Sequence, residues 1–125
     1  MSEDSEFIAL TTLLNRIPAI KGRIGTGRDD AAWWVKFVID ISDPLAWRVV
    51  QELGHVLNYL SLTERLPTVF MPVSPPPYLN GGPADFLSWV IECRDRRFSP
   101  QSLADCLAGR LPNPIDDRST WSIDA

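Results

Sequence analysis

The side chains best suited to nucleophilic or acid–base chemistry are few: one histidine, His55, and two cysteines, Cys93 and Cys106. A histidine beside a cysteine can generate a thiolate nucleophile. His55 falls on the polar side of a predicted helix, whereas both cysteines fall on the apolar sides of their predicted elements. We therefore expect His55 to face solvent and both thiols to pack as small buried apolar groups, with no catalytic pair among them.

Patterns typical of metal and phosphate sites are weak. Adjacent carboxylates at residues 29–30 and 116–117 could hold a hard cation, but such sites draw on several oxygens at defined spacing, and no third ligand recurs nearby. The glycines of residues 22–27 could suggest a phosphate-binding loop, yet a strand rather than a helix is predicted to follow them. No CxxC, HExxH or P-loop pattern occurs. The sequence thus predicts no catalytic residue, no metal site and no cofactor.

Two small basic clusters lie at residues 21–28 and 94–97, the first of them beside Trp33 and Trp34. Basic residues with exposed aromatic rings can bind single-stranded nucleic acid. The alternation of apolar residues assigns Trp33 to the core, however, and the chain has a net charge of −4 and a pI of about 4.8. Nucleic-acid binders are usually basic, so we expect a protein partner, and the acidic charge would suit a basic one.

The proline-rich segment 74–83 is the most unusual stretch. Three consecutive prolines impose polyproline-like extension, and the glycines that follow allow a tight reversal. Long loops are often functional, and prolines reduce the entropy lost when a partner fixes the loop. The alternative is that the loop folds back and buries Tyr78 over the sheet. The candidate partner-binding residues here are Pro76, Pro77, Tyr78, Leu79 and Asn80.

A second candidate surface is the outer side of a helix predicted to end near residue 60, where Trp47, Gln51 and His55 lie with Asn58. A tryptophan at a solvent-facing position either packs under the first helix or belongs to an interface. Gly54 costs this helix about 1 kcal/mol relative to alanine, which suggests that another element approaches closely there. Trp47, Gln51 and His55 complete the candidate partner-binding set.

The elements that must position these groups are organised around residues 33–60. Apolar residues alternate through residues 33–41, which predicts a strand with one fully apolar face. Asp43 and Pro44 are typical of a helix start, and apolar residues then recur at helical spacing to about residue 60. Strand and helix each present one apolar face, so we expect them to pack together.

The remaining elements follow from the same patterns. Residues 5–17 are predicted to form a helix, and the glycine-rich, charged residues 21–30 a loop. A short strand at residues 68–73 contains Pro72, which is typical of an edge strand. Residues 86–93 alternate as a third strand, and Ser99-Pro100 begins a helix that ends near residue 111. The tail, residues 112–125, is expected to run extended along the surface with Trp121 docked back.

The predicted order is helix, strand, helix, strand, strand, helix within a single domain of residues 1–125. We expect an α+β two-layer sandwich, in which a small mixed or antiparallel sheet of three to four strands has helices packed on one face. The first two strands could form a right-handed parallel crossover, and the third would then be antiparallel as a hairpin. Alternatively, the sheet is ferredoxin-like with a fourth strand in residues 20–26.

The composition is that of a globular domain, with 45% hydrophobic and 22% charged residues. The acidic start lacks the order of a signal peptide, no apolar run could span a bilayer, and two distant cysteines do not form a disulfide framework. These features predict a cytoplasmic protein without a membrane partner.

Three functions are compatible with these patterns. The leading one is a non-enzymatic protein-binding domain, for example a bacterial immunity or antitoxin-type inhibitor of a basic toxin. The second is a small-ligand module or minor enzyme with a pocket near Trp34, Tyr78 and Trp89. The third is a structural homo-oligomer that pairs through the edge at residues 68–73 or through the Trp47 face.

Overall fold

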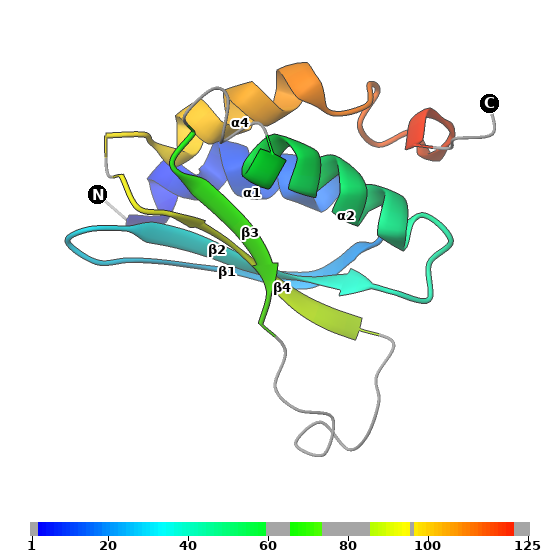
Figure 1. The fold of residues 1–125 in the computed structure, drawn as a ribbon, viewed down its shortest axis with the longest axis horizontal. Coiled ribbons are helices and arrows are strands. Elements are labelled where there is room, and N and C mark those ends of the chain that lie inside the picture. The colour runs from blue at the N-terminus through cyan, green and yellow to red at the C-terminus, as the bar shows by residue number, and fades with distance from the viewer. Residues whose placement is uncertain (1–2, 60–65, 74–85, 96, 122–125) are drawn as a thin grey trace, which may run out of the picture.

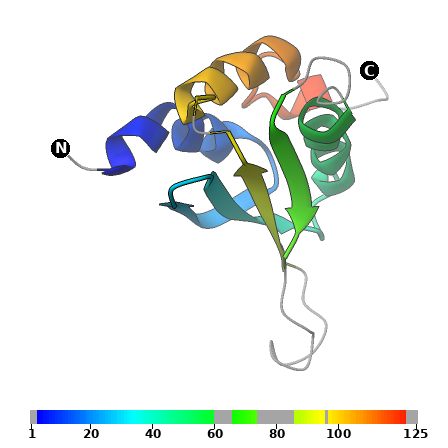
Figure 2. The same ribbon diagram turned by 60° about the vertical axis from the view of Figure 1, so that its left-hand side comes forward.

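The chain folds as a sheet covered on one side by helices. The computed structural model describes residues 3–59, 66–73, 86–95 and 97–121. Antiparallel strands pair in the order β1-β2-β4-β3, and α1, α2 and α4 all lie on the same side of this sheet (Figure 1), as Figure 2 also shows. The predicted α+β two-layer fold is therefore confirmed. The bounds are α1 (Ile8–Arg16), β1 (Ile20–Arg28), β2 (Trp33–Asp40), α2 (Ala46–Gly54), β3 (Thr68–Pro72), β4 (Phe86–Cys93) and α4 (Pro100–Arg110).

Strand β2 is central, as its alternating pattern predicts. Trp33, Val35, Phe37 and Ile39 point toward the helices and are at most 3% exposed. The intervening residues lie on the opposite face and are partly or fully exposed. Burial of four large apolar side chains on one face fixes the register, since a shift of one residue would turn all of them to solvent.

Strand β1 corrects the prediction of a loop at residues 21–30. It pairs antiparallel with β2 across a tight turn, with an irregular register between Lys21 and Gly25. The alternative of a fourth strand near residues 20–26 gave its position correctly, but no helix separates β1 from β2, so the order is not ferredoxin-like. β1 is an edge strand, buried fully only at Ile20, and it therefore lacks the apolar alternation by which a strand is recognised.

As predicted, β2 and β3 are connected through α2 and run parallel to one another, but the two strands are not neighbours in the sheet. β4 pairs antiparallel with both β2 and β3, so β2 and β3 are parallel to one another with β4 between them. The predicted hairpin of β3 with β4 is confirmed. β4 therefore occupies the position between β2 and β3, and its pairing with β2 joins residues far apart in the sequence.

The predicted capping residues begin one of the two helices but not the other. Ser99 caps α4 as predicted, because its hydroxyl accepts the Ser102 N–H at 3.1 Å. Asp43 instead accepts the N–H of Leu45, and α2 begins only at Ala46. A π-helix, η2 (His55–Tyr59), continues α2, and a 3-10 helix, η1 (Glu3–Phe7), precedes α1. The helix predicted at residues 5–17 thus covers the end of η1 and the whole of α1.

The C-terminal segment returns to the core rather than running extended throughout. Residues Arg118–Trp121 form a 3-10 helix, η4, and Trp121 is fully buried, as expected, with its indole N–H donating to the Ile115 carbonyl at 2.9 Å. Arg118 donates to both carboxylate oxygens of Asp43. Across the described residues, no helix has the length and apolar character needed to cross a membrane.

Candidate functional site

The ionisable groups singled out in the sequence do not converge. His55 is exposed on the outer side of the helix, where its ring stacks on Tyr59 with centroids 5.3 Å apart. Cys93 is fully buried, and burial raises the pKa of its thiol, which disfavours the nucleophilic thiolate. Cys106 is half-buried on α4. Within the residues that the structure describes, no group of three or more metal-ligating side chains occurs.

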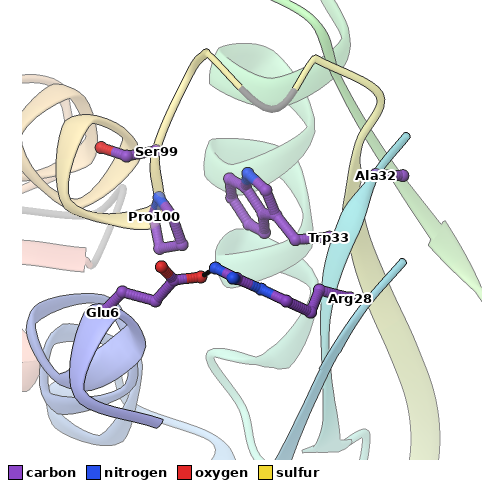
Figure 3. A pocket seen from close by; sticks show the side chains of 6 residues that line it. All are labelled: Glu6, Arg28, Ala32, Trp33, Ser99 and Pro100. Carbon is purple, nitrogen blue, oxygen red and sulfur yellow. Dashed lines mark ion pairs between the residues drawn. The ribbon is translucent and has the colours of Figure 1, made fainter. Parts of the chain in front are cut away.

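A pocket of about 180 Å³ lies where η1, the β1–β2 turn and the start of α4 meet. Figure 3 shows Glu6 and Arg28 directed toward one another across it, below Trp33 and Pro100, and the two side chains form an ion pair. Their charges neutralise each other inside the pocket. The remaining polar side chain, Ser99, is engaged in capping α4.

A wider groove, of about 480 Å³, separates α1 from the edge strand β1. We call it the α1–β1 groove. Phe7, Ile8 and Thr11 line it on the helix side, and Arg23, Ile24 and Thr26 line it on the strand side. Ile8 is 60% exposed, so part of an apolar wall faces solvent. The sequence analysis missed this groove because it depends on β1, which was predicted to be a loop.

The outer side of α2 and of η2, which continues it, carries a row of four exposed side chains, three of them with aromatic rings. We call this row the α2 aromatic face; it consists of Trp47, Gln51, His55 and Tyr59. Trp47 is 56% exposed and Tyr59 is 60% exposed. The members recur every four residues, so helical geometry aligns them along one side. The structure thus brings together three predicted candidates, Trp47, Gln51 and His55, and adds Tyr59, which the same spacing could have identified.

Two residues of this helix differ from the expectations. Asn58 is exposed, as predicted, but its side chain is directed to β3, because its amide nitrogen donates to the Phe70 carbonyl at 2.9 Å and its oxygen accepts the Phe70 N–H at 2.8 Å. Gly54 faces open space, since a Cβ atom there would meet nothing within 4 Å. Trp47 is 56% exposed, so it does not pack under the first helix.

Three further predicted surfaces are the proline-rich segment, the pocket near Trp34 and Trp89, and the edge at β3. Pro76, Pro77, Tyr78, Leu79 and Asn80 lie outside the described residues. Trp34 and Trp89 cannot line one pocket, because Trp89 pairs with the inward-facing Phe37 while Trp34 has the opposite parity on β2. The β3 edge predicted for self-pairing is covered, since Asn58 already satisfies the outward backbone groups of Phe70.

Comparisons with known proteins give no family for this chain. No protein-family model, no curated protein sequence and no solved structure matches it.

Proposed function

We propose that this chain is a non-enzymatic protein-binding domain that contacts its partner through the α2 aromatic face. The observation that carries this proposal is the exposure of Trp47 and Tyr59 on one helix, each with more than half of its surface in solvent. Tryptophan and tyrosine are enriched at the centres of protein interfaces, where burial of a large ring contributes much of the binding energy.

The geometry of the face favours a partner over solvent. Stacking of His55 on Tyr59 restricts both rings before binding, which reduces the entropy lost when a partner covers them. Trp47 supplies an apolar ring with one N–H donor, and Gln51 adds an amide between the two aromatic ends. A face of this composition suits a partner surface with an apolar centre and a polar rim.

The overall charge gives the proposal a more specific form. At a net charge of −4, the domain attracts basic proteins at long range, while the aromatic face supplies contact at short range. An immunity or antitoxin-type inhibitor of a basic toxin would need only these properties.

The test is site-specific cross-linking followed by affinity measurement. A photo-reactive amino acid placed at Gln51 should cross-link one protein in cells, whereas the same group at Gln101, exposed on α4, should not. With that protein purified, Trp47→Ala and Tyr59→Ala should each weaken binding about 30-fold, since truncation of a central interface residue costs about 2 kcal/mol or more.

The control is Ile8→Ala, which removes a side chain as exposed as Tyr59 from a different surface. It should leave the affinity unchanged. Equal cross-linking at both positions, or binding that survives the loss of both rings, would remove the α2 aromatic face from the proposal. A parallel variant, Tyr78→Ala with Leu79→Ala, measures separately whether the proline-rich segment contributes.

A further inference from the structure

We propose that the α1–β1 groove binds an extended acidic segment of another protein, which adds as a strand to the edge of β1. This inference is independent of the α2 aromatic face. It follows from three features: outward-facing backbone groups on β1, the shape of the groove and the charge of the residues around it.

The backbone of β1 is available for pairing. The Asp29 N–H donates to the Ala32 carbonyl at 2.9 Å, which makes these residues a hydrogen-bonded pair. Because antiparallel pairs alternate, the N–H and C=O groups of Thr26 and Arg28 point away from β2 toward the open edge. No backbone partner occupies that edge in the part of the chain that the structure describes.

The two edges of the sheet differ in this respect. On β3, the outward groups of Phe70 are bonded to Asn58, and Pro72 has no N–H to offer. Natural sheets usually protect their edges in such ways, since an open edge is a template for another strand. β1 has neither device from Ile24 to Arg28, which makes it the edge suited to strand addition.

The groove provides space for the side chains of such a strand. Thr26 and Arg28 pair with Val35 and Trp33, whose side chains point toward the helices. Alternate residues of an added strand would therefore point to the same side, into the space of about 480 Å³ beside α1. The exposed Ile8 lies there, so apolar side chains would be buried on this side.

The charge around the groove selects an acidic occupant. Arg23 is the charged residue among those that line it, no carboxylate does so, and Lys21 is exposed on the same strand. The Arg28 guanidinium is already paired with Glu6. A second copy of this chain would bring another set of these cations to the same edge, which is unfavourable. A strand whose groove-facing residues include both apolar and acidic side chains satisfies Ile8 and Arg23, which line the same groove.

The experiment uses an acetylated synthetic peptide of Thr-Val-Thr-Glu repeats, which carries valine and glutamate on one face, titrated into the isotopically labelled protein. The peptide should shift the backbone amide resonances of Ile24, Thr26 and Arg28 and slow hydrogen exchange at Thr26 and Arg28 at least about tenfold, because these N–H groups gain acceptors. A peptide with lysine in place of glutamate should bind at least about fivefold more weakly.

Variants separate backbone pairing from simple charge attraction. Thr26→Pro removes an outward donor without removing a β1–β2 hydrogen bond and should abolish the protection at Arg28. Arg23→Glu should weaken binding about five- to tenfold, whereas Lys36→Glu, the same charge change on the open sheet face, should weaken it much less.

The proposal is overturned if the peptide at millimolar concentration leaves the β1 amides unshifted, or if the two peptides bind equally. Equal losses in Arg23→Glu and Lys36→Glu would show attraction to net charge alone. Dimerisation through β1, seen by sedimentation and abolished by Thr26→Pro, would assign the edge to a second copy. None of these outcomes bears on the cross-linking at Gln51, so the two proposals fail separately.

Discussion

At the scale of single residues, Gly27 is a position where even the methyl group of alanine would have a clear structural consequence. A Cβ atom at Gly27 would lie 2.3 Å from an indole carbon of Trp34, its partner across the β1–β2 pair. The Trp34 ring therefore lies directly on the glycine backbone. An aromatic ring that covers a glycine in a neighbouring strand compensates for the packing that the glycine lacks. Gly25, two residues earlier on β1, has open space at the same point.

We expect Gly27→Ala to lower the free energy of unfolding by about 1–3 kcal/mol, because the Trp34 ring must leave its position. Gly25→Ala is the matched control and should be neutral or slightly stabilising, since alanine restricts the unfolded chain. Urea unfolding followed by tryptophan fluorescence measures both. Equal stabilities of the two variants would contradict the packing of Trp34 on Gly27.

At the scale of elements, the end of the α2 helix stabilises the edge of the sheet. The Asn58 side chain forms two hydrogen bonds with the backbone of Phe70, and Thr68 donates through its hydroxyl to the Leu57 carbonyl at 3.0 Å. The asparagine amide thus replaces the strand that β3 lacks on its outer side. The π-helix η2 places Leu57 and Asn58 against β3, which gives this irregular turn a structural role.

We expect Asn58→Ala to lower the free energy of unfolding by about 1–3 kcal/mol, since it leaves the outward N–H and C=O groups of Phe70 without their partners. The opened edge should also promote self-association at high concentration. Chemical unfolding and sedimentation velocity test the two effects. Gln51→Ala, an exposed change on the same helix, should show neither. A monomeric, fully stable Asn58→Ala protein would show that the edge needs no such cover.

At the scale of the whole molecule, the ion pair of Asp43 with Arg118 joins the start of α2 to the C-terminal η4. The Asp43 side chain is only 10% exposed, and both of its oxygens accept from the guanidinium, at 2.7 and 3.0 Å. Arg118 holds the pKa of Asp43 below its ordinary value, although burial acts in the opposite direction. Together with the buried Trp121, this pair fixes the last described turn of the chain on the domain.

Because the folded protein lowers the pKa of Asp43, the unfolded chain binds the proton more readily. The stabilisation is therefore fully present above about pH 4, the ordinary range of aspartate, and is lost as the pH falls through the folded pKa. We expect Arg118→Gln to lower the free energy of unfolding by about 1 kcal/mol at neutral pH, and we expect its difference from the unmodified protein to shrink as the pH falls below the ordinary pKa of aspartate.

Arg97→Gln is the control, because it removes a similar bidentate ion pair, that of Arg97 with Asp95, on the surface of the protein. The Arg97 side chain is 92% exposed. It should have no measurable effect on stability at any pH. Unfolding curves collected across this range, with the Asp43 carboxyl followed by NMR, test the pair directly. An Arg118→Gln effect that persists at low pH would mean that Arg118 acts through packing rather than charge.

Much of the candidate binding face could be predicted from the sequence, and little of the groove. The exposure and alignment of Trp47, Gln51 and His55 follow from helical spacing, which is a local property. The involvement of Asn58 with Phe70 could not be predicted in this way, since it requires the position of β3 beside the helix. The α1–β1 groove was missed for the same reason.

The sequence by itself determined the elements whose residues carry a strong local pattern: the buried face of β2, the bounds of β4, the cap of α4 and the return of Trp121. Tertiary structure alone decided that residues 20–28 pair as a strand, that β4 separates β2 from β3, and that one sheet edge is covered while the other is open. The reason is physical. Alternation and capping are set by neighbours in the chain, whereas an edge strand is stabilised by backbone hydrogen bonds to a distant partner, which leave no periodic trace in its own side chains.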